Sequence, residues 1–245
     1  MNLRFDGQVV AVSGAGHGLG QAIAELFSTL GAQVHGCAPT PATIDGIAMS
    51  QVDLTDRPAA AAWIAQVEAT EARPIDILVN NAGGVAGQVF QPLEKITDAD
   101  WDQIIAINLG AAFALSRAAA PAMKRAGQGR IVNISSGAGL QASLTGIQAY
   151  ASAKHAVVGL TRQLAHELGP HGITVNSVAP GLIPSNPASS AQWQSYGPTR
   201  QETMLNDISL RRLGTPQDIA HAVLFFASPL ASFVNGQILQ VDGGK

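Results

Sequence analysis

Short apolar segments alternate with longer amphipathic segments along most of the chain. Residues 8–13 form a valine-rich apolar run that ends at a glycine-rich turn, a pattern typical of a buried parallel strand. The apolar positions that follow recur at helical spacing: Leu19, Ile23, Leu26, Phe27 and Leu30. Gly31 predicts the end of that helix.

The same alternation continues to the end of the sequence. It predicts further strands at residues 33–37, up to about 52, 75–79, 130–134, 173–178 and 237–241, and helices at 59–69, 98–125, 148–168 and 216–227. Strands separated by helices form right-handed crossovers, so we expect one α/β domain over residues 1–245. Its architecture would be a Rossmann-like, doubly wound parallel sheet of about seven strands with helices on both faces. Residues 184–200 have little regular pattern, so residues 184–209 are predicted to be a substrate loop or lid.

Composition narrows the classes of partner. The net charge is −3 and the 14 lysines and arginines form no basic stripe, which argues against nucleic acid or a membrane surface. Cys37 is the only cysteine, and the first residues lack the apolar run of a signal peptide. No histidine spacing fits a metal site. We therefore expect a cytoplasmic protein, without a metal, that acts on small molecules.

A glycine-rich turn joins the first predicted strand to the first predicted helix. Gly14, Gly18 and Gly20 follow a G-xxx-G-x-G pattern rather than the commoner GxGxxG. Small residues let the backbone approach a pyrophosphate, and the N-terminus of a helix offers free N–H groups to that anion. A turn selected only for tight packing of strand and helix is the alternative.

A tyrosine and a lysine stand four residues apart in a predicted helix. Tyr150 and Lys154 therefore share one helix face, and an ammonium near a phenol, together with a cationic nicotinamide, favours phenolate at working pH. Ser136 follows a predicted strand at the sheet edge where open α/β sheets bind ligands. Taken by itself, the spacing is also compatible with a tyrosine and a lysine on the protein surface that have no catalytic role.

Taken together, these residues resemble the classical short-chain dehydrogenase/reductase family over essentially the whole chain. The resemblance is carried, in order, by Ser13-Gly14-xxx-Gly18-x-Gly20, Asp53, Asn80-Asn81-Ala82-Gly83, Asn108, Ser136, Tyr150-xxx-Lys154, Pro180-Gly181 and Val241-Asp242-Gly243-Gly244. It implies an NAD(P)-dependent enzyme acting on CH–OH groups. In such an enzyme Tyr150 exchanges the proton, Ser136 binds the substrate oxygen, Lys154 binds the nicotinamide ribose, and Asn108 holds a water that links the lysine to solvent.

The resemblance also implies a cofactor site. Asp53 would accept from the adenine amino group, residues 80–83 would lie along the adenosine ribose, and Ile183 and Ser185 would orient the carboxamide. The full set of predicted cofactor residues is Ser13, Gly14, Gly16, His17, Gly18, Leu19, Gly20, Ala38, Thr40, Asp53, Leu54, Asn80, Asn81, Ala82, Gly83, Tyr150, Lys154, Pro180, Gly181, Ile183 and Ser185.

The sequence departs from the family pattern at three points. Ser13 and Ser185 replace usual threonines but keep the hydroxyl. The spacing from Ser136 to Tyr150 is one residue longer than is common, so Ser135 is a rival for the substrate hydroxyl. Ser136 is preferred because Gly139 follows it at the usual offset.

Cofactor choice depends on the end of the second strand, where an acidic residue selects NAD. That position is Ala38, no arginine follows it, and Thr40 and His17 are able to bind a phosphate. The residues slightly favour NADP(H) over NAD(H).

Substrate identity is less constrained. The segment after Gly181 carries Asn186, Gln192, Gln194 and Arg200, which predict a small polar or hydroxylated substrate unless they only solvate a lid. Substrate contacts are expected at Ser136, Gly137, Tyr150, Trp193 and Tyr196. The alternatives are reduction of a β-ketoacyl group as in 3-oxoacyl-[acyl-carrier-protein] reductases, with Lys124, Arg125 and Arg130 as the docking patch, and a dinucleotide-binding regulator without turnover. Apolar helix faces predict a subunit interface, and the resemblance to the family implies a homotetramer.

Overall fold

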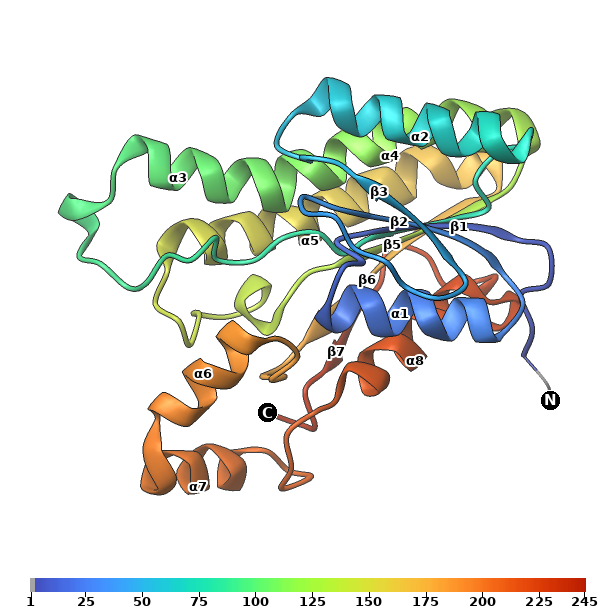
Figure 1. Cartoon of the computed structure of the whole chain (residues 1–245). Helices are drawn as coiled ribbons and strands as arrows, with labels where there is room; N and C mark the ends of the chain where they lie inside the picture. Colours follow the sequence, from blue (N-terminus) through green and yellow to red (C-terminus); the bar gives the residue numbers. More distant parts are fainter. Residues whose placement is uncertain (1–2) are drawn as a thin grey trace.

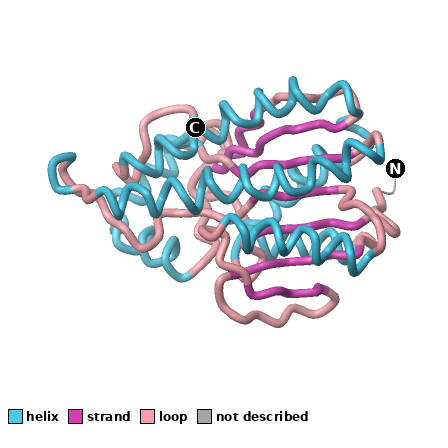
Figure 2. Tube along the Cα trace, turned by 90° about the horizontal axis from the view of Figure 1, so that it is seen from above, coloured by secondary structure: helices cyan, strands magenta, loops and turns pink. Residues whose placement is uncertain are grey.

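A parallel sheet of seven strands organises the computed structural model, which describes residues 3–245 (Figure 1). Its strands are β1 (Val9–Ser13), β2 (Gln33–Ala38), β3 (Ile47–Gln51), β4 (Ile77–Asn80), β5 (Gly129–Ile134), β6 (Ile173–Pro180) and β7 (Ile238–Val241). They lie in the order β3-β2-β1-β4-β5-β6-β7, so the direction of winding reverses between β1 and β4. Figure 2 shows the strands side by side in one layer, with loops and helices extending beyond one end. Ligands of doubly wound folds bind at such a reversal, beyond the carboxyl ends of the strands.

Helices cover both faces of the sheet. One face carries α1 (Gly18–Thr29) and α8 (Pro216–Ala227), and the other carries α2 (Arg57–Glu71), α4 (Ala111–Ala126) and α5 (Gln148–Leu168) (Figure 1). The shorter helical turns are η1 (Leu93–Lys95), η3 (Gly137–Gly139), η4 (Gly169–His171) and η5 (Pro229–Ala231).

Strand β1 explains why the first apolar run has no alternation. Val10 and Val12 lie in the apolar cluster beneath α1 and α8, whereas Val9 and Ala11 lie in the cluster beneath α2 and α4. Both faces of the strand are therefore buried, which requires apolar residues at every position. Cys37 is buried in β2, and its burial raises the pKa of the thiol to about 12.

Most predicted elements are present with small shifts at their ends. Helices α5 and α8 begin and end as predicted. The predicted long helix is continuous, but it comprises α3 (Asp98–Ile105), a π-helical turn η2 (Ala106–Gly110) and α4. By length and composition this segment could span a membrane, yet half of its most apolar window is buried inside the domain, as in a core helix.

The prediction that residues 184–200 lack regular structure is wrong. They contain α6 (Pro187–Ser195) and the beginning of α7 (Gly197–Asp207). Helix α6 begins at a capping box in which Asn186 and Ser189 bond each other's backbone N–H, followed by a proline in the first turn. Its stability comes from the cap rather than from an apolar stripe, which is why hydrophobic periodicity did not reveal it.

Candidate active site

Ser136, Tyr150 and Lys154 meet at the carboxyl end of β5. Ser136 follows the strand, and the other two residues lie in the first two turns of α5. The Nζ atom of Lys154 is 5.7 Å from the centroid of the Tyr150 ring and donates a hydrogen bond of 2.9 Å to the main-chain oxygen of Ile134. The Ser136 side chain lies within hydrogen-bonding reach of the phenol and also accepts from the N–H of Ala138 at 3.1 Å. The predicted convergence of the three side chains is present.

Burial acts on the two ionisable groups in opposite senses. It raises the pKa of Tyr150 above its usual value, and the neighbouring Ser136 hydroxyl offsets only part of that rise. It lowers the pKa of Lys154 to about 8, because the ammonium is fully removed from water. In the protein alone, Tyr150 is therefore a phenol at neutral pH. The sequence predicted that Lys154 and a cationic nicotinamide would together lower the pKa of Tyr150. In the protein alone the pKa is raised instead, because burial outweighs the neighbouring polar groups.

Ser135, the rival for the substrate hydroxyl, lies inside the sheet. Its Oγ donates to the main-chain oxygen of Val178 at 3.2 Å and accepts from the hydroxyl of Ser177 at 2.9 Å. Ser135 is buried, whereas Ser136 is partly exposed and next to Tyr150. The geometry favours Ser136.

Asn108 holds the loop that follows β4 in place, close to Lys154. Within the π-helical turn its Nδ2 donates to the oxygens of Gly84 (2.8 Å) and Ile104 (3.0 Å), and its Oδ1 accepts from the N–H of Gly84 at 3.0 Å. A side chain at Gly83 would come within 3.3 Å of the Lys154 Nζ atom. The side-chain amide is thus occupied by main chain, a contact that sequence reasoning did not anticipate. π-Helical turns recur at functional sites.

The β1–α1 turn fits a dinucleotide pyrophosphate. His17 precedes α1 and its side chain forms no cap hydrogen bond with the helix N–H groups, and the first turn of α1 contains no acidic residue. The free N–H groups and the positive end of the helix dipole suit an anion. Gly18 has a φ of +63°, and a side chain there would lie 3.0 Å from the main-chain oxygen of Ser185. The turn and the β6–α6 loop therefore approach each other across the space that a pyrophosphate would need.

Ser13 organises this turn rather than facing outward. Its buried hydroxyl donates to the oxygen of Val79 at 3.3 Å and accepts from the N–H groups of Asn81 and Ala82, both at 3.0 Å. The amide of Asn81 returns two hydrogen bonds to the oxygens of Ser13 and Gly14. The hydroxyl has no remaining hydrogen-bonding capacity, so it couples the ends of β1 and β4.

The predicted adenosine-binding residues lie together at the ends of β2, β3 and β4. Ala38 is buried, whereas His17 and Thr40 are exposed. Asp53 is exposed, and its Oδ1 accepts from the N–H and hydroxyl of Thr55, which lowers the pKa of the carboxyl. The Asn80 side chain turns inward and donates to Ser116 and Asn133, so only its main chain is available to a ligand.

The predicted substrate residues on α6 bond to one another. Gln192 donates to the Tyr196 hydroxyl at 2.8 Å, and the rings of Trp193 and Tyr196 pack edge to face at 6.3 Å. The Arg200 guanidinium stacks on the Tyr196 ring at 4.4 Å. These contacts hold the segment together and occupy part of its hydrogen-bonding capacity.

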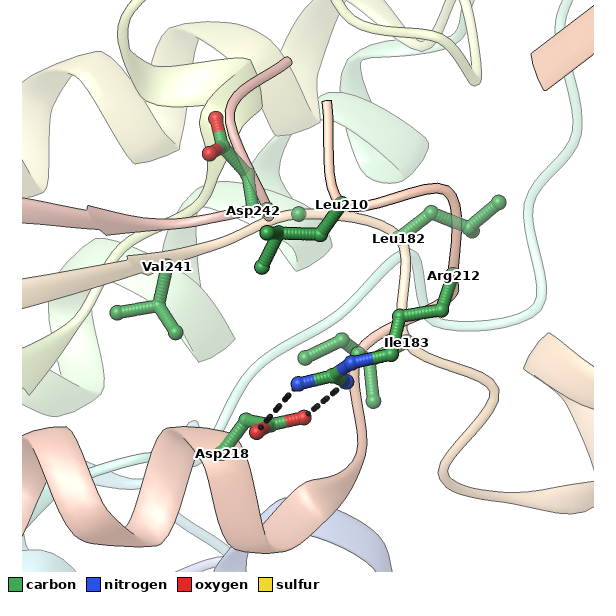
Figure 3. Close-up of a pocket in the computed structure, with 10 residues that line it drawn as sticks. Leu182, Ile183, Leu210, Arg212, Asp218, Val241 and Asp242 are labelled. Atoms are coloured by element: carbon green, nitrogen blue, oxygen red, sulfur yellow. Dashed lines mark hydrogen bonds and ion pairs between the residues drawn. The ribbon is translucent and has the colours of Figure 1, made fainter. Parts of the chain in front are cut away.

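A small cavity of about 110 Å³ lies where the end of α7 meets the sheet (Figure 3). Its walls come from Leu182, Ile183, Leu210 and Val241, and from Arg212, which forms a bidentate ion pair with Asp218. Tyr150 is not among its lining residues. Ser136 does not line it either, whereas Gly181 and Ile183 do, so the cavity adjoins the predicted carboxamide-binding residues rather than the Ser136 and Tyr150 hydroxyls.

Comparison with known proteins gives a consistent picture. A family model described as enoyl-(acyl carrier protein) reductase matches residues 14–245. The 3-oxoacyl-[acyl-carrier-protein] reductase FabG of Vibrio harveyi is 35% identical over 99% of this chain and 98% of its own length. The 7alpha-hydroxysteroid dehydrogenase of Escherichia coli K12 is 37% identical over 99% and 96%.

A solved structure matches the fold over nearly the whole chain. The crystal structure of a Beutenbergia cavernae protein assigned as an NAD(P)-dependent gluconate 5-dehydrogenase, with NADP at low occupancy, superposes with a TM-score of 0.87. It is 35% identical, and the match covers 99% of this chain and 98% of that one. The similar proteins are thus oxidoreductases with differing substrates.

Proposed function

We propose that Ser136, Tyr150, Lys154 and Asn108 carry the reaction of this chain, which belongs to the classical short-chain dehydrogenase/reductase family. Members of this kind, and this chain with them, are NAD(P)-dependent oxidoreductases that interconvert alcohols and ketones. The observation that carries this proposal is the meeting of Ser136, Tyr150 and Lys154 at the carboxyl end of β5. Bound reduced nicotinamide supplies the hydride for the carbonyl carbon.

Tyr150 and Ser136 act on the substrate oxygen. In reduction, the phenol of Tyr150 donates its proton to the oxygen, and the hydroxyl of Ser136 donates a hydrogen bond to it. Burial keeps the phenol protonated at neutral pH, which suits the reducing direction. In oxidation Tyr150 must first lose its proton, so that direction should become faster as the pH rises.

Lys154 and Asn108 serve the tyrosine and the cofactor. The Lys154 ammonium is held by the Ile134 oxygen, where it would bind ribose hydroxyls and stabilise phenolate during oxidation. Because the Asn108 amide is engaged with Gly84, its main-chain oxygen is the group we assign to the proton-carrying water. The predicted dinucleotide contacts of the β1–α1 turn, Asp53, Leu54, residues 80–83, Pro180, Gly181, Ile183 and Ser185 belong to this proposal.

Kinetics of a single variant test the assignment. Ketone reduction followed at 340 nm should lose about 10²- to 10⁴-fold in kcat when Tyr150 becomes phenylalanine, which removes the proton and keeps the ring. Binding of NADPH, measured by fluorescence, should change little. If Tyr150→Phe retained most of the turnover, the proton donor would have to be another group.

NADP(H) is the proposed preference over NAD(H). No carboxylate stands at Ala38 to repel a 2′-phosphate, and the exposed Thr40 and His17 side chains are available to it. The Beutenbergia cavernae relative carries NADP. Steady-state kinetics with both cofactors decides this, and a higher kcat/KM with NADH would refute the preference.

Reduction of a carrier-bound β-ketoacyl group is the second candidate, favoured by the FabG relatives. Its docking patch is weak here, because Lys124 is paired with Glu167 at 3.2 Å and Arg130 is half buried. Turnover of acetoacetyl-carrier protein well above that of the free thioester would support this candidate.

We also propose a cytoplasmic homotetramer. Trp101 and Phe113 are exposed on α3 and α4, and Phe225 and Leu239 are exposed on α8 and β7. Large exposed apolar side chains on two separate faces suit two interfaces. Sedimentation as a monomer at micromolar concentration would refute the tetramer.

A further inference from the structure

Two uncharged loops frame the catalytic hydroxyls. Residues 81–93 follow β4 and residues 137–149 connect Ser136 to Tyr150, and neither stretch contains a charged residue. Both carry large apolar side chains in contact with solvent. This group, the apolar mouth, consists of Val89 (72% exposed), Phe90 (62%), Leu93 (72%), Leu140 (36%) and Leu144 (54%).

The two loops pack against each other and continue into the site. The Phe90 ring lies against Gly146, where an added Cβ atom would come within 2.9 Å of it. Gln148 donates to the main-chain oxygen of Gln91 at 3.1 Å. Val85 and Ile147 from the same loops lie in one apolar cluster with Tyr150. The apolar mouth is therefore continuous with the side chains that act on the substrate oxygen.

Several polar groups expected to recognise a hydroxylated substrate already have partners within the 184–209 segment. Asn186 caps α6, Gln192 donates to Tyr196, and Arg200 stacks on the same ring. Gln201 donates to the main-chain oxygen of Trp193. Substrate hydroxyls would therefore compete with contacts inside the segment for the Gln192 amide N–H groups and the Tyr196 hydroxyl.

We infer that the substrate is an uncharged ketone or secondary alcohol with an apolar body that covers the apolar mouth, an inference that rests on the proposed function. Large exposed apolar side chains gathered on two loops that pack together mark a binding surface rather than ordinary surface. A carbonyl that reaches Ser136 and Tyr150 comes between the two loops, so its substituents contact them. Residues 81–93 and 137–149 offer no positive side chain to an acidic or phosphorylated substrate, and the next charged residues along the first loop are Glu94 and Lys95.

A graded series of ketones tests the inference. Reduction of 4-methyl-, 4-ethyl- and 4-propylcyclohexanone is compared with that of 4-hydroxycyclohexanone, with NADPH and with NADH. We expect kcat/KM to rise two- to fourfold per added methylene, the factor that burial of one methylene produces. The propyl compound should exceed the hydroxy compound at least tenfold.

Variants locate the preference on the loops. Phe90→Ser combined with Leu144→Ser should reduce the propyl-to-hydroxy ratio at least tenfold. Phe233→Ser is the matched control, because Phe233 is fully exposed and precedes β7, at the opposite ends of the strands. The control should leave the ratio unchanged, and circular dichroism should show all variants folded.

The outcomes separate this inference from the proposed function. A kcat/KM that falls with alkyl length, or that is highest for the hydroxy compound, overturns the apolar substrate and leaves the reaction intact. A propyl-to-hydroxy ratio of kcat/KM that is unaffected by the double substitution also overturns the inference. If the sedimentation coefficient changes at the same time, the apolar mouth is a subunit interface. If no ketone or alcohol is turned over with either cofactor, the proposed function itself fails.

Discussion

Replacement of Lys154 by methionine isolates the cost of holding an ammonium group inside the protein. Burial lowers the pKa of Lys154 from 10.5 to about 8. That difference, 10.5 − 8, corresponds to about 3 kcal/mol of destabilisation while the group stays charged. Methionine keeps most of the volume and removes the charge. It also leaves the Ile134 oxygen without its donor, which costs about 1–3 kcal/mol at any pH.

The pH dependence separates these two effects. Below pH 8 the fold holds the charged lysine at full cost. As the pH rises from 8 towards 10.5, the folded state releases the proton and the unfolded state keeps it, so stability increases. The wild type should gain about 2 kcal/mol between pH 7 and 9.5 relative to Lys154→Met. Above pH 10 the raised pKa of Tyr150 contributes with the opposite sign, which sets the upper limit of the window.

Urea unfolding at fixed protein concentration, without dinucleotide, measures this difference. Circular dichroism is followed at pH 7, 8, 8.75 and 9.5 for the wild type, Lys154→Met and the exposed control Lys95→Met. The control should run parallel to the wild type. Parallel curves for Lys154→Met as well would show that Lys154 is hydrated, and the reasoning from burial would be refuted.

Three further substitutions probe other parts of the site. Ser13→Ala leaves the N–H groups of Asn81 and Ala82 without an acceptor, so the free energy of unfolding measured in urea should fall by about 2 kcal/mol. Ser13→Thr keeps the hydroxyl and should unfold with nearly the free energy of the wild type. Ala38→Asp places a carboxylate near the adenosine 2′-position, so the kcat/KM ratio of NADPH to NADH should fall at least tenfold; an unchanged ratio would contradict the assigned position. Asn186→Ala removes the α6 cap, which costs about 1 kcal/mol locally; faster hydrogen exchange confined to residues 187–195 is expected, and unaltered exchange would argue against the cap.

Elements with strong apolar periodicity and clear ends could be predicted from the sequence. Helix α8 begins at Pro216, directly after Thr215, which forms a capping box with Asp218. Its apolar residues face the sheet. The buried strands followed from uninterrupted apolar runs between glycines. The proximity of Ser136, Tyr150 and Lys154 could also be predicted, because the end of a strand places Ser136 and helical spacing places the other two on one face.

Features that depend on individual hydrogen bonds could not be predicted. Helices α6 and α7 are rich in polar residues, and only the Asn186-Pro187 start was a usable signal. The π-helical turn at Asn108 has no sequence signature, and neither has the engagement of its amide by Gly84. The expectation of a polar substrate counted Gln192 and Arg200 as free groups, because a sequence does not show that their partners lie one turn away.

The burial of Cys37 makes the protein well suited to site-specific labelling. Its thiol is inaccessible in β2 and stays protonated at the pH used for maleimide coupling, since its pKa is about 12. With no second native cysteine in the sequence, a cysteine introduced at the exposed Gln194 would be the one reactive thiol. A fluorophore attached there would test in real time whether α6 moves as cofactor and ketone are added.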